Sequence, residues 1–296
     1  MDESDFLTPA RVAILGLGLM GGSLAMALRG KCASLLGIDS DPETLALARR
    51  LQIVDRVENR PEDLLPEADV VILATPVRAI VTLLGELASL HPGEAVVIDL
   101  GSTKMGIVQA MAALPDRFDP VGGHPMCGKE RSSLANAEAG LFRGAPFAFT
   151  PLPRTTPRGR GLAMQLAQAL GAEPLWLDPE THDRWVGSTS HLPYLIANIL
   201  AAVVPAEAAP MAGMGLRSTT RLAPSPLNVM RDILMTNREN VLAGVRRFQD
   251  RLDSVEKRLA EGDEGGLAEL LSQGALNYES LIGYQRRDNE EWGRIT

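Results

Sequence analysis

The sequence predicts an α/β protein, with a doubly wound, mostly parallel sheet followed by an all-α C-terminal domain. Short apolar runs rich in β-branched residues alternate with helical patterns over residues 1–178, as βαβ units require. A glycine-rich turn at residues 16–21 directly follows the first of these runs. After Asp178 only helical patterns remain. These three observations define the predicted architecture.

The expected elements follow one another in a regular order. Strands are predicted at residues 11–18, 34–39, 69–76, 95–100, 119–124, 145–150 and 173–178. Helices are predicted at residues 20–29, 42–51, 77–89 and 103–113, and a further helix follows the Pro/Arg/Gly-rich loop 151–161. The run 69–76 is mostly apolar and ends in Thr75-Pro76, which is typical of a strand buried on both faces of a parallel sheet.

The change of pattern at residue 178 predicts two domains, a dinucleotide-binding domain at 1–178 and a helical substrate and dimerisation domain at 179–296. The helical domain is expected to break near 205–210 and 262–266, with one long helix over 226–260. From Val241 onward the apolar residues of this helix are spaced alternately four and three apart, like a coiled-coil seam. Such a seam packs within one subunit or against a second chain. We favour the second, and therefore a homodimer, because a small helical domain gains core by pairing.

Composition and charge exclude several classes of protein. The formal net charge of −8 argues against a broad nucleic-acid-binding surface, which needs clustered Lys and Arg. The two cysteines, Cys32 and Cys127, lack metal-ligand spacing, so we expect no metal site and a reducing, cytoplasmic location. The acidic N-terminus is unlike a signal peptide. We expect no membrane-spanning segment, since no uninterrupted apolar stretch approaches the ~20 residues that a bilayer needs.

The glycine-rich turn predicts a dinucleotide site. Gly16, Gly18 and Gly21 form a G-x-G-x-x-G pattern between the first strand and the first helix, in the context of a Rossmann-type βαβ unit. The first glycine permits the tight turn, the second lets the backbone approach a pyrophosphate, and the third lets helix and strand pack closely. Leu19 and Met20 would present backbone N–H groups at the helix N-terminus. The alternative is a glycine-rich turn without a ligand.

Asp39 indicates NAD as the cofactor. It ends the second strand, 18 residues beyond Gly21, where a carboxylate accepts hydrogen bonds from the adenosine ribose. The same charge would repel the 2′-phosphate of NADP, and no nearby Arg offsets it. The alternative is that Asp39 caps the next helix, although Asp41 is better placed to do so. Thr75 and Pro76, at the end of a neighbouring strand, are further candidate cofactor residues.

Polar groups also end the next two strands, where ligands of an open parallel sheet bind. His124 is one of four histidines and lies where the nicotinamide is expected, so it is a candidate base as hydride leaves the substrate. A histidine on a loop is otherwise often solvated. Ser102 either hydrogen-bonds His124 or the nicotinamide, or caps the helix after Thr103.

Several motifs resemble the prephenate/arogenate dehydrogenase family, in the family's order, from residue 11 to about 245. They are GLGLMGGSLA at 16–25, DLGSTK at 99–104, the His124-Pro125-Met126 loop ending in Glu130, SHLP at 190–193, TTRLA at 219–223 and RDI at 231–233. The resemblance implies NAD-dependent oxidative decarboxylation of prephenate in tyrosine biosynthesis, with His124 acting on the substrate hydroxyl and Ser102 orienting it. It also implies that Arg221 binds a substrate carboxylate, that His191 lines the pocket, and that Lys104 and Glu130 support the site.

Three residues depart from the family pattern. Tyr194 stands where some members have a second histidine, Met230 where an aromatic residue is common, and Lys129 where a small hydroxylated residue is common. These changes affect the choice between prephenate, which ends in a keto acid, and arogenate, which ends in an amino acid. The extra cation of Lys129 favours prephenate.

Two other classes of function compete with this interpretation. A β-hydroxyacid dehydrogenase would need a catalytic Lys in the second domain, yet residues 179–256 contain no Lys. A non-catalytic dinucleotide-binding protein is opposed by the joint presence of Ser102, His124 and Arg221.

Overall fold

The computed structural model describes residues 5–129 and 132–292, with side chains as far as residue 281. The chain divides into two compact units, one ending at Val241 and one beginning at Leu242. The predicted domain boundary at 178/179 marks the change from strands to helices and stays a prediction. All the residues of the site discussed below belong to the first unit.

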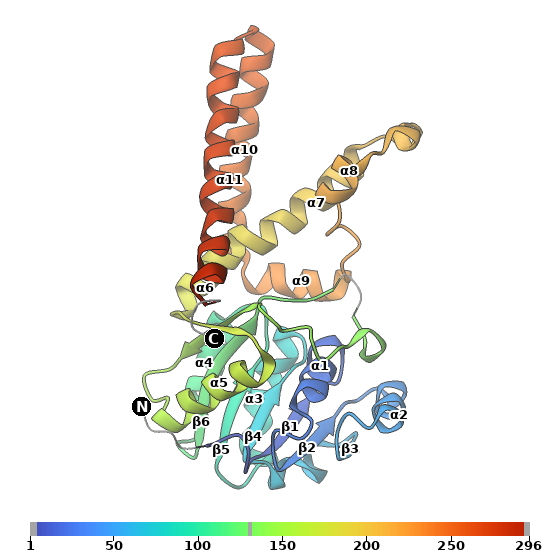
Figure 1. Cartoon of the computed structure of the whole chain (residues 1–296), viewed down its shortest axis with the longest axis vertical. Coiled ribbons are helices and arrows are strands. Elements are labelled where there is room, and N and C mark those ends of the chain that lie inside the picture. Colours follow the sequence, from blue (N-terminus) through green and yellow to red (C-terminus); the bar gives the residue numbers. More distant parts are fainter. Residues whose placement is uncertain (1–4, 130–131, 293–296) are drawn as a thin grey trace. The chain divides into compact units, whose positions relative to one another are not determined.

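The first unit is built on an eight-stranded sheet with the order β3-β2-β1-β4-β5-β6-β7-β8 (Figure 1). All neighbouring pairs are parallel except β6 and β7. The fold class predicted from the sequence, a mostly parallel doubly wound sheet followed by helices, is confirmed. The strands are β1 Arg11–Leu15, β2 Ser34–Ile38, β3 Arg56–Glu58, β4 Val70–Leu73, β5 Ala95–Asp99, β6 Phe118–Pro125, β7 Pro146–Pro151 and β8 Glu173–Trp176.

Helices connect the strands and continue the chain beyond the sheet. Those between strands are α1 Leu19–Leu28, α2 Pro42–Leu51, α3 Val77–Leu90, α4 Met105–Ala112 and α5 Pro157–Leu170. Those beyond β8 are α6 Pro179–Val186, α7 Leu192–Val203, α8 Met214–Thr219, α9 Leu227–Thr236, α10 Arg238–Glu261 and α11 Glu264–Trp292. A π-helical turn, Gly187–His191, joins α6 to α7.

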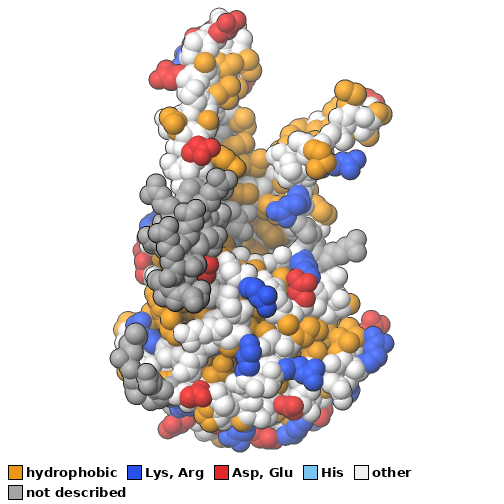
Figure 2. All heavy atoms as spheres, viewed as in Figure 1, with side chains coloured by type: hydrophobic (Ala, Val, Ile, Leu, Met, Phe, Trp, Pro, Cys, Tyr) orange, Lys and Arg blue, Asp and Glu red, His pale blue; other side chains and the backbone are white. Residues whose placement is uncertain are grey.

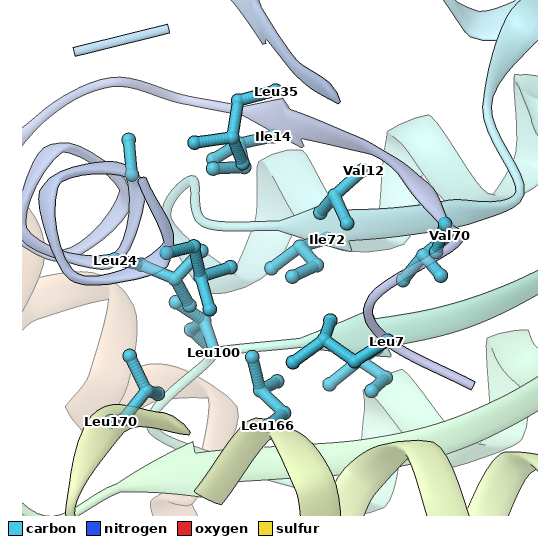
Figure 3. Packing of buried hydrophobic residues seen from close by; sticks show 14 of the residues in the cluster. Leu7, Val12, Ile14, Leu24, Leu35, Val70, Ile72, Leu100, Leu166 and Leu170 are labelled. Carbon is cyan, nitrogen blue, oxygen red and sulfur yellow. The ribbon is translucent and has the colours of Figure 1, made fainter. Parts of the chain in front are cut away.

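Each face of the sheet carries its own hydrophobic core, because alternate strand residues point to opposite faces. Val12 and Ile14 pack on the face covered by α1 and α5, together with Leu24 and Leu166 (Figure 3). The intervening strand residues, such as Ala13, pack on the opposite face against α3 and α4. This double covering explains the continuous apolar runs of the central strands.

The strand order reverses between β1 and β4, since the chain runs outward to β2 and β3 and then returns to β4. In an open parallel sheet this switch point forms a crevice at the carboxyl ends of the strands, where ligands bind. The glycine-rich turn follows β1, Thr75 follows β4, Ser102 follows β5, and His124 lies near the end of β6. The fold therefore brings the predicted cofactor and catalytic residues to one edge of the sheet.

Two elements differ from the sequence-based expectation. Strand β3 has three residues and too little apolar alternation to be predicted. The single long helix predicted over 226–260 is wrong, because the chain breaks at Asn237 into α9 and α10. The Asn237 side-chain amide donates to the carbonyl of Asp183 at 2.7 Å, so this residue takes a tertiary contact at the helix end. The predicted breaks near 205–210 and 262–266 are confirmed.

One helical stretch of the described chain, Pro179–Val203, is long and apolar enough to cross a membrane by length and composition alone. This stretch was not singled out in the sequence, where polar residues interrupt it. It carries His182, Asp183 and His191, each about 1% exposed, and all three are hydrogen-bonded to other parts of the first unit. We therefore interpret it as a helical stretch that packs into the first unit.

The second unit consists of α10 from Leu242 onward and α11, joined at Gly262 and Asp263. The Asp263 carboxylate forms an ion pair with Arg258 and accepts a hydrogen bond from the Gly266 N–H at 2.9 Å. These bonds stabilise the turn between the helices. Several large apolar side chains of this unit remain exposed in the single chain, among them Leu252, Leu259, Leu271, Leu276 and Leu281.

Candidate active site

The glycine-rich turn is closed toward the sheet and open outward. Gly16 has a φ of +93°, which side chains rarely adopt. A Cβ on Gly21 would lie 1.8 Å from the carbonyl oxygen of Gly16, so helix α1 packs directly on the turn. A Cβ on Gly18, by contrast, would meet no atom within 4 Å. The turn therefore forms a cradle whose open side is at the N-terminus of α1, the position suited to a pyrophosphate.

Two cavities flank this cradle. One, of about 430 Å³, is lined by the predicted cofactor residues Gly16, Asp39 and Thr75, among others. The other, of about 410 Å³, is lined by residues that include Gly18, Leu19, Met20, Thr75, Pro76, Ser102 and Lys129. A further cavity of about 630 Å³, lined by Arg29, Arg49 and residues of β3, does not include any predicted site residue.

Thr75 lines both flanking cavities, and its Oγ1 atom is buried without a hydrogen-bond partner. A buried hydroxyl in this state is costly unless a ligand or water completes it. The orphaned hydroxyl, the open cradle and the paired cavities fit an extended dinucleotide, with adenosine beside Asp39 and nicotinamide beside Ser102.

Asp39 stabilises the cradle directly. Its Oδ2 accepts the Leu17 N–H at 2.7 Å, and its Oδ1 accepts the Asp41 N–H at 2.9 Å. The alternative that Asp39 caps α2 is wrong, because the Asp41 side chain makes the capping bonds to Glu43 and Thr44. Asp39 also lines the cavity of about 430 Å³, and its role in selecting against a 2′-phosphate stays a prediction.

His124 is held by a second histidine that was missed in the sequence. Its Nδ1 lies 2.9 Å from Nε2 of His182, on α6, and His182 Nδ1 lies 2.8 Å from Asp183 Oδ1. His124 is 8% exposed, and both α6 residues are about 1% exposed. The signal available in the sequence was the rarity of histidine together with Asp178-Pro179, which caps and starts α6.

Asp183 connects this cluster to helix α4. Its two carboxylate oxygens accept the backbone N–H groups of Lys104 and Met105 at 2.7 and 3.0 Å. These groups belong to the N-terminus of α4, which otherwise lacks a side-chain cap, so a negative charge is favoured there. The alternative role of Ser102 as the cap of this helix is therefore wrong.

Lys104 connects the ends of β5 and β6, next to His124. Its ammonium is fully buried, bonds the buried Asp99 carboxylate and donates to the Gly123 carbonyl at 2.6 Å. Asp99 also accepts the N–H groups of Gly101 and Gly123, at 2.7 and 2.9 Å. The pair thus ties the end of β5 to the residue before His124, which matches a supporting role for Lys104.

His191 lies at the end of the π-helical turn, about 1% exposed. Its Nδ1 lies 3.1 Å from the Asn237 side-chain nitrogen, which also donates to the Asp183 carbonyl. Asn237 was missed in the sequence, and it links α9 to both α6 and the turn. His191 does not line either flanking cavity among the described residues, so its role in binding substrate stays a prediction.

Burial controls the charge of these histidines. It lowers the pKa of His124 well below its usual range, and neighbouring His182, Lys104 and His191 lower it further. Burial also lowers the pKa of His191 to about 4, although Asp183 opposes the shift. Both imidazoles are therefore neutral at neutral pH, the state in which His124 accepts a proton.

We expect these two shifts to make the protein sensitive to mild acid. Between pH 6.5 and 4 these histidines are protonated in the unfolded chain but remain neutral in the folded chain. The free energy of unfolding therefore decreases as pH falls. For His191 the loss approaches about 3 kcal/mol near pH 4. Thermal unfolding at pH 7.5, 6.5 and 5.5 should show Tm decreasing below pH 6.5, with a shallower slope for His191→Gln. A Tm that is unchanged down to pH 5.5 would contradict the buried neutral state.

Of the remaining predicted residues, some line the cavity of about 410 Å³ beside Ser102, which we call the nicotinamide-side cavity, and others do not. Ser102 lines that cavity, but within the described residues no hydrogen bond joins it to His124. Tyr194 is buried at 5% exposure in α7. Arg221 is exposed after α8 and is not among the described residues lining either flanking cavity. Glu130 lies outside the described residues. The predicted substrate contacts of these residues stay predictions.

Lys129 lines the nicotinamide-side cavity, but its charge is already matched. Its ammonium lies 2.9 Å from the Glu138 carboxylate and donates to the Asn136 carbonyl at 3.0 Å. The effect of this paired cation on the choice of substrate stays a prediction.

A dinucleotide cradle at the switch point, together with a buried neutral histidine at a nearby strand end, defines a dinucleotide-dependent dehydrogenase. Comparisons with known proteins narrow this class. Residues 24–173 match the family described as prephenate dehydrogenase, nucleotide-binding domain, and residues 178–273 match prephenate dehydrogenase, dimerization domain. The chain belongs to the prephenate dehydrogenase family.

Individual relatives agree with this membership. Prephenate dehydrogenase of Bacillus subtilis is 34% identical over 261 residues, which cover 83% of this chain and 68% of the relative. A crystal structure of prephenate dehydrogenase from Aquifex aeolicus, in complex with hydroxyphenyl propionate and NAD+, aligns with a TM-score of 0.84 at 30% identity, over 93% and 99% of the two chains. Arogenate dehydrogenase from Synechocystis aligns with a TM-score of 0.76 at 25% identity, over 92% and 99%.

Proposed function

We propose that this chain is an NAD-dependent prephenate dehydrogenase, which converts prephenate to 4-hydroxyphenylpyruvate and CO2. The observation that carries the proposal is the buried, neutral His124 at the end of β6, on the same sheet edge as the glycine cradle. The 34% identical relative from Bacillus subtilis and the Aquifex structure with NAD+ support the choice of reaction and cofactor.

The cradle and its two cavities hold the cofactor, through the N-terminus of α1, Asp39 and Thr75. When bound, NAD+ would supply the acceptor for the hydride that leaves the ring carbon carrying the hydroxyl group. His124 is placed to accept the hydroxyl proton, because its neutral ring has one nitrogen not engaged by His182. As the hydride leaves, the ring carboxylate is lost as CO2, its bonding electrons complete the aromatic ring, and the phenolic oxygen takes the proton back from His124.

The direct test is an absorbance assay at 340 nm with purified protein, in which NAD and NADP are each combined with prephenate and arogenate. We expect the highest kcat/KM for NAD with prephenate. Arogenate is the competing substrate, because the Synechocystis relative is an arogenate dehydrogenase. Absence of turnover in all four combinations would overturn the proposed function.

Asp39 is expected to set the preference for NAD. Replacing it with alanine removes both the charge that repels a 2′-phosphate and the acceptor for the Leu17 N–H. We expect Asp39→Ala to raise the KM for NAD by about tenfold and to lower the NAD/NADP ratio of kcat/KM by at least as much. Steady-state kinetics with both cofactors measures this ratio.

Asp41→Asn is the matched control for this prediction. Asp41 is two residues away and caps α2, and asparagine caps a helix equally well. The cofactor ratio should therefore stay unchanged in Asp41→Asn. A ratio that is equally unchanged in Asp39→Ala would assign the cofactor preference to another residue.

We further propose that the protein forms a homodimer through its helical region, in the cytoplasm. Two findings support the dimer: residues 178–273 match a dimerization domain, and the helices beyond β8 expose large apolar side chains in the single chain (Figure 2). The exposed residues include Ile199, Val203, Met211 and Met214 in the first unit and the leucines of the second. Light scattering at micromolar concentration should give twice the chain mass of 31.7 kDa, and the monomer mass would contradict the proposal.

A further inference from the structure

A chain of hydrogen bonds extends from His124 away from the cofactor cradle. It runs from His124 Nδ1 to His182 Nε2 at 2.9 Å, and from His182 Nδ1 to Asp183 Oδ1 at 2.8 Å. Its three members come from β6 and α6 and are all buried. Water therefore does not compete for these two hydrogen bonds, so the three ring nitrogens that form them depend on one another and on Asp183.

The direction of the chain follows from its far end. The two oxygens of Asp183 accept backbone N–H groups from Lys104 and Met105, and a backbone N–H can only donate. The carboxylate is thus an acceptor, and His182 Nδ1 must carry the proton that it donates to Asp183. His182 is about 1% exposed, and burial favours the uncharged ring, which carries one proton; in that form His182 Nε2 is an acceptor. His124 Nδ1 must then be the donor, and His124 Nε2 has no proton.

We propose that His182 and Asp183 are positioning residues that fix His124 in the tautomer with its proton on Nδ1, leaving Nε2 free to accept the substrate's hydroxyl proton. This inference rests on the proposed function. A His124 ring with its proton on Nε2 would present a donor where the reaction needs an acceptor. The same logic governs the serine-protease triad, in which a buried Asp selects the tautomer of the catalytic base.

The arrangement also supports His124 after it has taken the proton. The ring then carries a positive charge in a buried environment that disfavours charge. His182 conveys the stabilising effect of the Asp183 carboxylate to that charge through two hydrogen bonds. Asp183 is itself fixed at the N-terminus of α4, so it holds the orientation of His182, and through it that of His124.

The structure sets the tautomers of all four histidines, which makes the proposal measurable. His91 lies 2.8 Å from the Ala68 carbonyl through Nε2, and its Nδ1 accepts the Gly93 N–H. His191 Nδ1 accepts from Asn237, whose side-chain nitrogen is identified as a donor by its bond to the Asp183 carbonyl. We therefore expect protons on Nδ1 in His124 and His182, and on Nε2 in His91 and His191.

The first test is 15N NMR of the full chain labelled at histidine, at pH 7.5 without substrate, with each signal assigned by single substitution. The expected result is the division into two Nδ1–H and two Nε2–H rings. His124 with its proton on Nε2, or His182 with its proton on Nε2, would overturn the proposal. The division into two Nδ1–H and two Nε2–H rings is read from the unsubstituted protein, and the single substitutions serve only to assign each signal to its residue.

The second test compares two replacements of His182. His182→Phe keeps a flat ring of similar size but removes the acceptor for His124, so kcat should fall by about 10- to 100-fold while the KM for NAD stays the same. His182→Gln retains an acceptor oxygen within reach and should recover most of the lost kcat. A kcat for His182→Phe within twofold of the unsubstituted enzyme would overturn the proposal.

His91→Phe is the matched control, because His91 is equally buried at 1% exposure but lies at the end of α3. It should lower Tm and leave kcat within twofold, which separates a loss of packing from a loss of positioning. Failure of the proposed function is distinguishable from failure of this inference. The first appears as no turnover by the unsubstituted protein, and the second as the wrong tautomer or an unaffected His182→Phe variant.

Discussion

Replacing His124 with asparagine should lower kcat by at least about 10²-fold. The imidazole is the one buried neutral base that the structure places at the end of β6 beside the cofactor edge, within the part of the chain that is described. Asparagine keeps a polar side chain but has no nitrogen that accepts a proton near neutral pH. The loss should appear in kcat and kcat/KM together, since the proton is transferred only on the way to the transition state.

Dissociation constants for NAD and thermal unfolding provide the controls for His124→Asn. Cofactor binding should be unchanged, because the cradle, Asp39 and Thr75 follow β1, β2 and β4, whereas His124 lies on β6. The pH profile adds a second check on the unsubstituted enzyme. A lowered pKa keeps His124 neutral to more acidic pH, so the acid limb of kcat/KM attributed to this residue should lie below pH 6.5. A kcat for His124→Asn within threefold of the unsubstituted value would remove His124 from the chemistry.

The cofactor half of the site could be predicted because its signals are local. Gly16, Gly18 and Gly21 lie within one turn, and Asp39 follows at a spacing set by one βαβ unit. The N-cap of α2 was likewise readable from Asp41-Pro42, and the structure confirms that capping bond. Local patterns of this kind depend on backbone geometry that neighbouring residues determine, so they need no knowledge of distant contacts.

The support of His124 could not be predicted, because it depends on contacts between distant parts of the chain. His182 is 58 residues from His124, and Asn237 is 54 residues from Asp183. No periodicity links such pairs. The sequence predicts His124 as the base and Ser102 as the residue that orients it, whereas in the structure His182 makes the hydrogen bond to His124.

Replacing Lys104 with methionine should destabilise the protein by about 3–5 kcal/mol, the cost of leaving a buried charge without its partner. Lys104 and Asp99 are both fully buried, and burial lowers the pKa of the Lys104 ammonium while Asp99 opposes that shift. Methionine fills nearly the same volume, so the loss reports on the charge and not on a cavity. We expect a decrease in Tm of roughly 10 °C at pH 7.5, measured by calorimetry.

The pH dependence of this loss separates an unpaired carboxylate from a general packing defect. Without Lys104, Asp99 keeps the N–H groups of Gly101 and Gly123 but lacks a compensating cation, so its carboxyl group gains from taking up a proton. The difference in Tm between Lys104→Met and the unsubstituted protein should therefore narrow as pH falls toward 5. Lys257→Met is the matched control, because that side chain is 71% exposed and its loss should cost less than about 1 kcal/mol at either pH. A Tm difference for Lys104→Met as small as that of the control would show that the buried pair does not hold β5 and β6 together beneath His124.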